Sequence, residues 1–510
     1  MTGDKGSVAG GLAQGSANQR PGKAQRFFRG LLGGLICSGG IATPALALCP
    51  ADLPAAVEAV TARPEMARSR LGLQVATLDG SVVYERESDR FFVPASTLKL
   101  LTTAAVLTHL GPDYQIRTSV HGVVNGTGLT PLRVVGRGDP SFTSEDLGDL
   151  AQQLRGQNLG MIPQLIGDES AFPGSAINPN WEWEDVQAGY GAAANALILN
   201  GNALGLALVP QAVGQPLQVV WDNPALGAIW QVENRSRTVA AGQSESVTLG
   251  RALDRPLLRV GGQLVVGSRP ARTAIAIPNP GEAFLREFRQ TLQDQGLQVG
   301  TTVVTPIPTP SLPPELAAVV SPPLSALLIP TNRSSNNLYA EALLKQLGRD
   351  QVSPPHPQAD WGEETEDVTE VSLEIAQHLL ADLGVDPETI VMVDGSGLAR
   401  KNLVTPAALV TVLQAMARSP YAAVYRDSLA VAGVNGTLGN RLRDTPAAGR
   451  LWGKSGALSR NFALAGYLDP PNHEPLAFAV IINNIDQPGS TARQIIDTIV
   501  VALAELESCG

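Results

Sequence analysis

A serine and a lysine three residues apart, Ser96 and Lys99, are the pair in this chain best suited to chemistry. They open an apolar run at residues 100–107, just after Pro94, which predicts a buried helix. On a helix, a spacing of three places the hydroxyl and the amine on one face. A desolvated lysine loses its proton more readily and can activate a neighbouring hydroxyl as a nucleophile. The pair therefore predicts nucleophilic catalysis, although a helix-capping serine followed by a surface lysine has the same spacing.

Two later motifs add further hydroxyl, amide and amine groups. Ser335-Asn336-Asn337 precedes a helical run at residues 338–344, and it could equally be a helix-capping cluster. Lys454-Ser455-Gly456 leads into an apolar strand, where a glycine lets the backbone of a ligand approach closely. In this order, Ser-x-x-Lys, Ser-x-Asn and Lys-(Ser/Thr)-Gly form the three-part signature of the serine penicillin-recognising enzymes.

Further blocks resemble one family of these enzymes, the class C low-molecular-mass penicillin-binding proteins, of the penicillin-binding protein 4 type. These are D-alanyl-D-alanine carboxypeptidases/endopeptidases of peptidase family S13. The blocks that carry the resemblance are residues 136–140, 181–185, 190–191, 200–202, 335–341, 394–398 and 433–438. They cover nearly the whole chain after residue 47, in order. One departure is Ser455, where this family usually has threonine; serine keeps the hydroxyl and loses a methyl group.

The resemblance implies acyl transfer on peptidoglycan stem peptides that end in D-Ala-D-Ala, with β-lactam antibiotics as inhibitors. Ser96 would be the nucleophile and Lys99 its base, while Ser335 would relay a proton to the leaving nitrogen. Asn337 and Lys454 complete the expected catalytic set, Asn337 by holding the substrate amide and Lys454 by meeting the terminal carboxylate. The expected substrate-binding residues are Ser455, through its hydroxyl, Gly456 and Ala457, whose backbone N–H forms an oxyanion hole with that of Ser96. No cofactor or metal ion is implied.

Three alternative functions share some of these features. A serine β-lactamase has the same three motifs but hydrolyses penicillin quickly, and the long middle of this chain argues against it. A non-catalytic cell-wall-binding protein on the same fold would not need all of these side chains. Residues 448–455 also match a loose phosphate-binding loop, but such a loop must be followed by a helix, whereas residues 463–468 predict a strand.

The elements that must position these residues come from both ends of the chain. We expect a short helix at residues 51–62, a hairpin of residues 71–78 and 81–86 around Asp79-Gly80, and a final helix at residues 491–507. Residues 456–468 and 476–483 are expected to form paired strands. This order predicts an α+β fold in which one antiparallel sheet is built from both ends. By resemblance, it is a serine β-lactamase/transpeptidase-like domain with helices flanking the sheet.

The middle of the chain interrupts that domain. Residues 115–309 are rich in β-formers and glycine, with helical patterns only near 144–156 and 281–295, and a proline-dense stretch closes the segment. We therefore expect one or two inserted β-rich subdomains at 115–309. The catalytic domain is expected to comprise residues 48–114 and 310–510.

Residues 1–47 have the layout of a secretory signal peptide: basic residues, a short apolar stretch and an Ala-Leu-Ala cleavage site at 45–47. A retained membrane anchor is the alternative, but the stretch is too short to span a bilayer. Without these residues, which hold five of the 37 Lys and Arg and one of the 47 Asp and Glu, the formal charge is −14. We expect an exported protein of the periplasm or cell envelope with no membrane span after cleavage, and so acidic a chain is a poor partner for nucleic acid.

Two cysteines remain after the predicted cleavage, Cys49 and Cys509. In an oxidising compartment they could form a disulfide that ties the two ends of the chain together. Two unpaired thiols are the alternative at this point.

Overall fold

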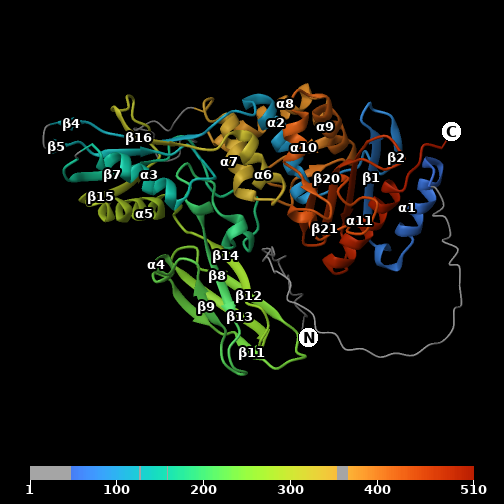
Figure 1. Ribbon diagram of the computed structural model, residues 1–510, viewed down its shortest axis with the longest axis horizontal. Helices are drawn as coiled ribbons and strands as arrows, with labels where there is room; N and C mark the ends of the chain where they lie inside the picture. Colours follow the sequence, from blue (N-terminus) through green and yellow to red (C-terminus); the bar gives the residue numbers. More distant parts are fainter. Residues whose placement is uncertain (1–47, 126–127, 158, 353–365, 510) are drawn as a thin grey trace, which may run out of the picture.

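Six antiparallel strands, drawn from both ends of the chain, form the predicted sheet. Strand β1 pairs with β22 along its whole length, from Arg70 opposite Asn483 to Thr77 opposite Leu476. The order across the sheet is β19 (Ala430–Val431), β20 (Leu451–Leu458), β21 (Asn461–Leu468), β22 (Leu476–Asn483), β1 (Arg70–Thr77) and β2 (Val82–Arg86). The predicted α+β class, with an antiparallel sheet flanked by helices, is confirmed (Figure 1).

The computed structural model describes residues 48–125, 128–157, 159–352 and 366–509 of the 510-residue chain. The predicted signal peptide, residues 1–47, lies outside the described residues. Among the helices that are described, none combines the length and the apolar character needed to cross a bilayer.

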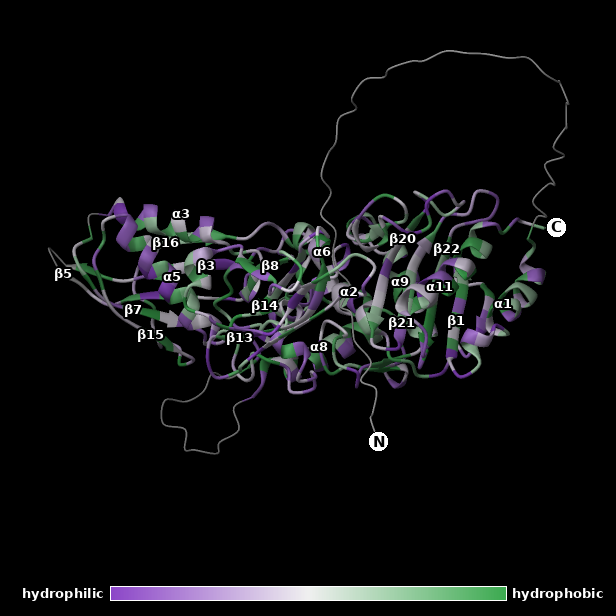
Figure 2. Cartoon of the chain, turned by 90° about the horizontal axis from the view of Figure 1, so that it is seen from below, coloured by the Kyte–Doolittle hydropathy of each residue, from purple (hydrophilic) through white to green (hydrophobic). Residues whose placement is uncertain are grey.

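The two faces of the sheet bury alternate residues of each strand against different helices, as the period of a strand requires. In β22, Ala477 and Ala479 face one core, and Phe478 and Val480 face the other. The second core is covered by α1 (Leu53–Thr61) and α11 (Gly489–Ala504). The first is covered by α2 (Lys99–Leu110), α6 (Leu324–Asn332), α7 (Asn337–Gly348), α8 (Val368–Asp382), α9 (Pro406–Arg418) and α10 (Ala422–Asp427). Figure 2 shows hydrophobic residues along these strands, between the two helix layers.

Two local expectations from the sequence need correction. The apolar run at residues 456–468 is not one strand but the end of β20 and all of β21, because Arg460 has a φ of +64° and turns the chain between them. Ser96 does not lie in an α-helix; it lies in a 3₁₀ turn, η3 (Ala95–Leu98), and α2 begins at Lys99. The turn in the first run falls at the exposed, polar Ser459 and Arg460, whereas the residues around Ser96 are mostly buried and give no such signal.

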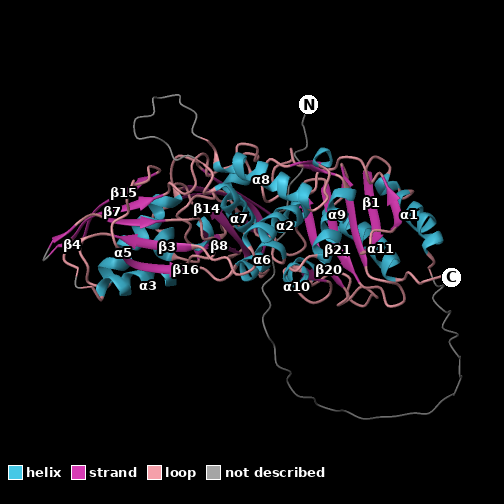
Figure 3. Cartoon of the chain, turned by 90° about the horizontal axis from the view of Figure 1, so that it is seen from above, coloured by secondary structure: helices cyan, strands magenta, loops and turns pink. Residues whose placement is uncertain are grey.

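The middle of the chain forms a second region that lies end to end with the first, with α7 and α8 near their junction (Figure 3). Its larger sheet is mixed, and α3 (Ser144–Arg155) and α5 (Pro280–Asp294) pack on it, which confirms the two predicted helices. The strand order of this sheet is β15 (Val299–Thr305), β7 (Ile162–Asp168), β6 (Leu132–Val135), β3 (Arg117–His121) and β16 (Glu315–Val320). A small hairpin, β4 (Val124–Asn125) with β5 (Gly128–Leu129), extends from it.

Two smaller sheets enclose a further core that includes Leu206, Trp230 and Val260. One contains β14 (Ala271–Ala276), β8 (Ala203–Val209) and β9 (Gln218–Trp221), and the other β10 (Gln231–Asn234), β13 (Leu257–Val265), β11 (Arg237–Val239) and β12 (Ser246–Arg251). The short helix α4 (Pro224–Gly227) follows β9, and β17 (Ile390–Val391) pairs with β18 (Leu403–Val404) in the first region. The predicted β-rich insertion is therefore present.

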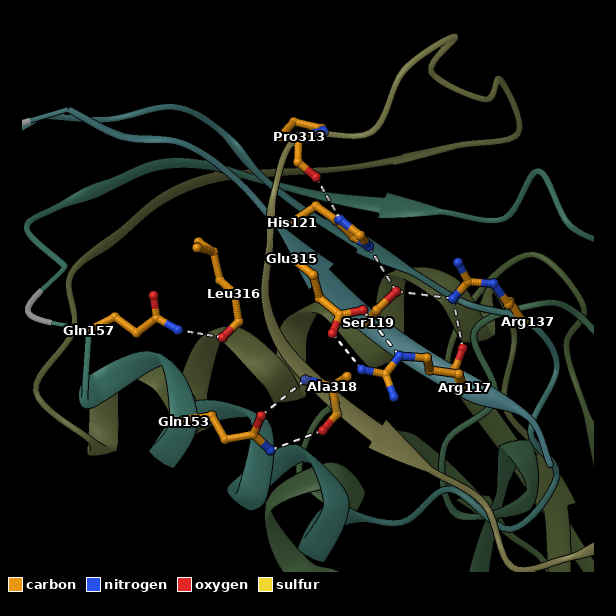
Figure 4. A network of polar contacts seen from close by, with 10 residues as sticks. All are labelled: Arg117, Ser119, His121, Arg137, Gln153, Gln157, Pro313, Glu315, Leu316 and Ala318. Atoms are coloured by element: carbon orange, nitrogen blue, oxygen red, sulfur yellow. Dashed lines mark hydrogen bonds and ion pairs between the residues drawn. The ribbon is translucent and has the colours of Figure 1, made fainter.

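Strand β16 returns the chain to the first region, and polar contacts hold it in place on the sheet (Figure 4). Arg117 of β3 forms an ion pair with Glu315, and Gln153 of α3 donates to and accepts from the backbone of Ala318, at 3.0 Å in each case. The division of the chain at 309 and 310 stays a prediction, and the pairing of β16 with β3 favours a return to the first domain after Val320.

The two ends of the described chain are joined covalently. Cys49, just before α1, and Cys509, after α11, form a disulfide with their Cα atoms 5.6 Å apart, which confirms the possible pairing. Beside it, the backbone N–H of Glu507 donates to the carbonyl of Leu48 at 3.0 Å. The two helices that cover one face of the sheet are thus linked at their outer ends.

Candidate active site

Ser96 and Lys99 meet at the junction of η3 and α2. The Lys99 Nζ lies 3.0 Å from the Ser96 Oγ, so the predicted pair is in hydrogen-bond contact. The turn that presents Ser96 is strained, because Ala95 has a φ of +48°, in the left-handed region that a residue with a Cβ adopts at a cost of about 1–3 kcal/mol. Lys99 is completely buried, whereas Ser96 is only partly so, which leaves the hydroxyl open to a substrate.

Two further groups fix the Lys99 amine, and both can only accept. Its Nζ lies 2.7 Å from the Asn337 Oδ1 and 2.6 Å from the carbonyl oxygen of Ser396. A neutral amine has two N–H donors and one lone pair. With both donors directed at these acceptors, the lone pair is left facing the Ser96 hydroxyl, so the neutral form of Lys99 can accept the proton of Ser96.

Asn337 owes its orientation to the inserted region. It is the first residue of α7, and the preceding Asn336 caps the helix by accepting from the N–H of Tyr339 at 3.2 Å. The Asn337 Nδ2 donates to the carbonyl of Tyr190 at 2.9 Å, which leaves its Oδ1 for Lys99. Tyr190 belongs to the 3₁₀ turn η5 (Gly189–Gly191) of the insert, so the insert forms part of the site.

Ser335 and Lys454 form a second hydrogen-bonded set. The Lys454 Nζ donates to the Ser335 Oγ at 2.7 Å and to the carbonyl of Ser455 at 2.8 Å. Because the Ser335 oxygen accepts from the Lys454 Nζ, its own hydrogen remains available for another partner. Ser335 also has a left-handed φ of +62°, a second strained residue at the site.

Strand β20 brings the third motif against the serine turn. A Cβ on Gly456 would lie 2.6 Å from the carbonyl oxygen of Pro94, so only glycine allows this close approach. Ala457 follows on an exposed position of β20, and the Ser455 Oγ lies 2.8 Å from the Thr437 Oγ1. The strand continues into β21 and not into a helix, so the phosphate-binding-loop alternative is wrong.

Burial dominates the electrostatics of the two lysines. Desolvation lowers the pKa of Lys99 to about 7, although the nearby Asp394 and Glu341 carboxylates oppose the shift. Desolvation together with the positive charge of Lys99 holds the pKa of Lys454 well below its usual range. A lysine with a pKa near 7 is present partly as the free amine at neutral pH, which a general base requires.

The structure therefore brings together all the residues that the three motifs predicted. Sequence reasoning missed the carbonyls of Tyr190 and Ser396, which carry no side-chain signal of their own. For Ser396, the sequence did offer one signal: the block at 394–398 contains two glycines, Gly395 and Gly397, which indicate that other groups pack closely against the backbone there. The Thr437 hydroxyl was also missed, although it lies inside the block at 433–438.

The fold and the three motifs define a serine peptidase of the penicillin-recognising class. The model of the D-Ala-D-Ala carboxypeptidase 3 (S13) family matches residues 53–506. A D-alanyl-D-alanine carboxypeptidase of Actinomadura sp. (strain R39) is 32% identical over 468 residues, which are 88% of this chain and 84% of that protein. The chain belongs to the D-Ala-D-Ala carboxypeptidase 3 (S13) family, and the predicted family and enzyme class are confirmed.

Solved structures show the same fold. The crystal structure of penicillin binding protein 4 from Haemophilus influenzae matches with a TM-score of 0.73 and 22% identity, covering 88% of this chain and 98% of that one. The structure of that protein complexed with a β-lactam matches with a TM-score of 0.70 and 21% identity, covering 88% of this chain and 99% of that one.

Proposed function

We propose that this carboxypeptidase cleaves the terminal D-Ala-D-Ala bond of peptidoglycan stem peptides through an acyl-enzyme on Ser96. The observation that carries the proposal is the arrangement around Lys99. Its two acceptor-only partners, Asn337 and Ser396, occupy both N–H donors of the neutral amine. The remaining lone pair then takes the Ser96 proton as the oxygen attacks the penultimate D-alanine carbonyl.

The second hydrogen-bonded set would complete the reaction. Ser335 relays to the departing D-alanine nitrogen the proton that Lys99 took from Ser96, giving up its own hydrogen and receiving that one, while its contact with Lys454 holds its oxygen in place. The Lys454 and Ser455 side chains meet the substrate's terminal carboxylate, and the N–H groups of Ser96 and Ala457 hold the oxyanion. Water then hydrolyses the ester and regenerates the serine. A β-lactam mimics the dipeptide and forms the same ester.

One experiment tests the nucleophile and the activity together. The protein is incubated with a fluorescent penicillin, the adduct is followed by intact mass over hours, and D-alanine release from a pentapeptide is measured in parallel. We expect a long-lived adduct and D-alanine release, both absent in Ser96→Ala. Rapid turnover of the drug would instead indicate a β-lactamase, and the absence of both labelling and D-alanine release would refute both enzymatic interpretations.

We also propose that the protein is exported and works in the cell envelope. The layout of residues 1–47 and the Cys49–Cys509 disulfide support this, because disulfides persist in oxidising compartments. Intact mass of the protein recovered from its native host tests cleavage after Ala47. A chain that retains residues 1–47 would contradict this cleavage.

A further inference from the structure

The turn that supplies the Ser396 carbonyl, residues 394–397, packs between α7 and the 3₁₀ turn η3. A Cβ on Gly395 would lie 3.0 Å from both the Ala340 carbonyl oxygen and the Leu344 Cβ of α7. Gly397 has a φ of +77°, and a Cβ there would overlap the carbonyl of Ala95 beside Ser96. The position of this turn therefore fixes how α7 sits relative to the nucleophile.

Two buried carboxylates hold the backbone of that turn. Glu341 of α7 accepts from the N–H of Ser396 at 2.8 Å and from that of Gly395 at 3.1 Å. Asp394 accepts from the N–H of Gly397 at 2.7 Å. Glu341 is 3% exposed and Asp394 is not exposed at all, so water does not satisfy either group.

The Asp394 contact bears directly on the base. The peptide between Ser396 and Gly397 accepts from the Lys99 Nζ at its carbonyl and donates to Asp394 at its N–H. A carboxylate at the N–H end of a peptide makes the carbonyl a stronger acceptor, because hydrogen bonds in a chain polarise one another. The neighbouring peptide is held in the same manner, since Thr102 of α2 donates to the Gly395 carbonyl at 2.7 Å and Glu341 accepts at the other side.

The charged groups around Lys99 form a small buried set. Asp394 and Glu341 favour its protonated form, while burial opposes it, and the charge of Lys99 in turn lowers the pKa of Lys454 on β20. Lys345, one turn beyond Glu341 on α7, donates to the carbonyls of Ser175 and Ala194 in the insert. Burial and the charge of Asp394 raise the pKa of Glu341, while its backbone hydrogen bonds and Lys99 oppose the shift.

We propose that Glu341 and Asp394 are positioning residues that hold the Ser396 carbonyl against Lys99 and stabilise the protonated form of this lysine. The inference rests on the proposed function, in which Lys99 is the base. Burial favours the neutral form of Lys99, and the two carboxylates favour its protonated form. Their balance sets the pH at which the base becomes active.

The test is the pH dependence of Ser96 acylation by a fluorescent penicillin, from pH 5.5 to 9, in Glu341→Gln. Glutamine keeps the shape and one acceptor but removes the charge. We expect the inflection to move to lower pH by up to about one unit, because the ammonium has lost a nearby opposite charge, which is partial near pH 7 since the pKa of Glu341 is raised to about 7. We expect the rate at high pH to remain within about tenfold of that of the unmodified enzyme. An inflection that stays in place, whatever the rate, overturns the proposal.

Three further variants separate charge from geometry. Thr102→Val removes the contact with Gly395 without changing charge, and should lower the rate at high pH while leaving the inflection in place. Asp139→Asn neutralises a buried carboxylate in the insert, which accepts a hydrogen bond from Ser141. This control variant should leave both the rate at high pH and the inflection unchanged. Asp394→Asn should shift the inflection in the same direction as Glu341→Gln. A folded protein from either acid variant is enough, and failure of both to fold would assign these acids to the fold and refute the proposal.

The failure of this inference is distinguishable from that of the proposed function. If the unmodified protein is not labelled at Ser96, the proposed function fails. If it is labelled but the acid variants keep its inflection, only the role of Glu341 and Asp394 fails. Direct titration adds a second readout, because the chain has only six lysines and ¹³C-labelled Lys99 can be followed by NMR.

Discussion

Lys99 has the properties of a base only because of where it is buried. Its ordinary pKa is near 10.5, and burial lowers it to about 7. Below that pH the ammonium has no lone pair and cannot take the Ser96 proton. Above it the free amine dominates. The lowering is opposed by nearby carboxylates, so it depends on several residues at once.

We therefore predict that acylation of Ser96 by a β-lactam accelerates about tenfold per pH unit below pH 7 and levels off above it. The sign follows from the shift, because the active form is the deprotonated one. The measurement is the second-order rate of adduct formation between pH 5.5 and 9 at constant ionic strength. A rate that is flat or falling across pH 7 would exclude Lys99 as the base.

At the scale of elements, β20 packs closely against the turn that carries Ser96. Gly456 lies directly against the turn that carries Ser96, and a Cβ there would meet Pro94 at 2.6 Å and the Ala95 Cβ at 3.1 Å. The neighbours are backbone and a short side chain, so they cannot move aside cheaply. The turn itself would have to shift.

We predict that Gly456→Ala destabilises the protein by about 1–3 kcal/mol, the usual cost of overpacking, and lowers the acylation rate at least tenfold. Gly148→Ala, in α3, is the matched control: its Cβ meets nothing within 4 Å, and it should be neutral or stabilising by about 0.5–1 kcal/mol. Thermal unfolding and labelling of both variants provide the comparison. Unchanged labelling in Gly456→Ala would show that the close contact is not needed for catalysis.

Much of this arrangement could be predicted from local patterns. The hairpin around Asp79-Gly80, the strand at 476–483 and the helices at 144–156 and 281–295 were all found, because each has a clear period or turn signal. The motif residues were found because their chemistry depends on side-chain type. The Tyr190 and Ser396 carbonyls could not be found in this way, since any residue has a carbonyl and only the tertiary fold aims it.

At the scale of the whole molecule, the disulfide closes almost the entire described chain into one loop. Cys49 and Cys509 lie 460 residues apart in sequence, next to the helices on the face of the sheet opposite to α2. A cross-link over so long a loop limits the unfolded chain, and removing a native disulfide typically costs about 2–5 kcal/mol.

We predict that replacing both cysteines with serine lowers the melting temperature but leaves the rate of Ser96 acylation unchanged, because the active site lies on the other face. The unmodified protein with and without a reducing agent serves as the internal comparison. A loss of labelling in the folded double variant would contradict this separation of stability from activity.

The pairing of β1 with β22 also determines when, during synthesis, the catalytic sheet can form. Ser96 is made early, but the strand beside β1 is synthesised roughly 400 residues later, and contacts so distant in sequence form slowly. A nascent or truncated chain that ends before β22 carries the nucleophile and lacks the sheet that orients it. We therefore expect no acylation of Ser96 until β22 has been synthesised and has paired with β1.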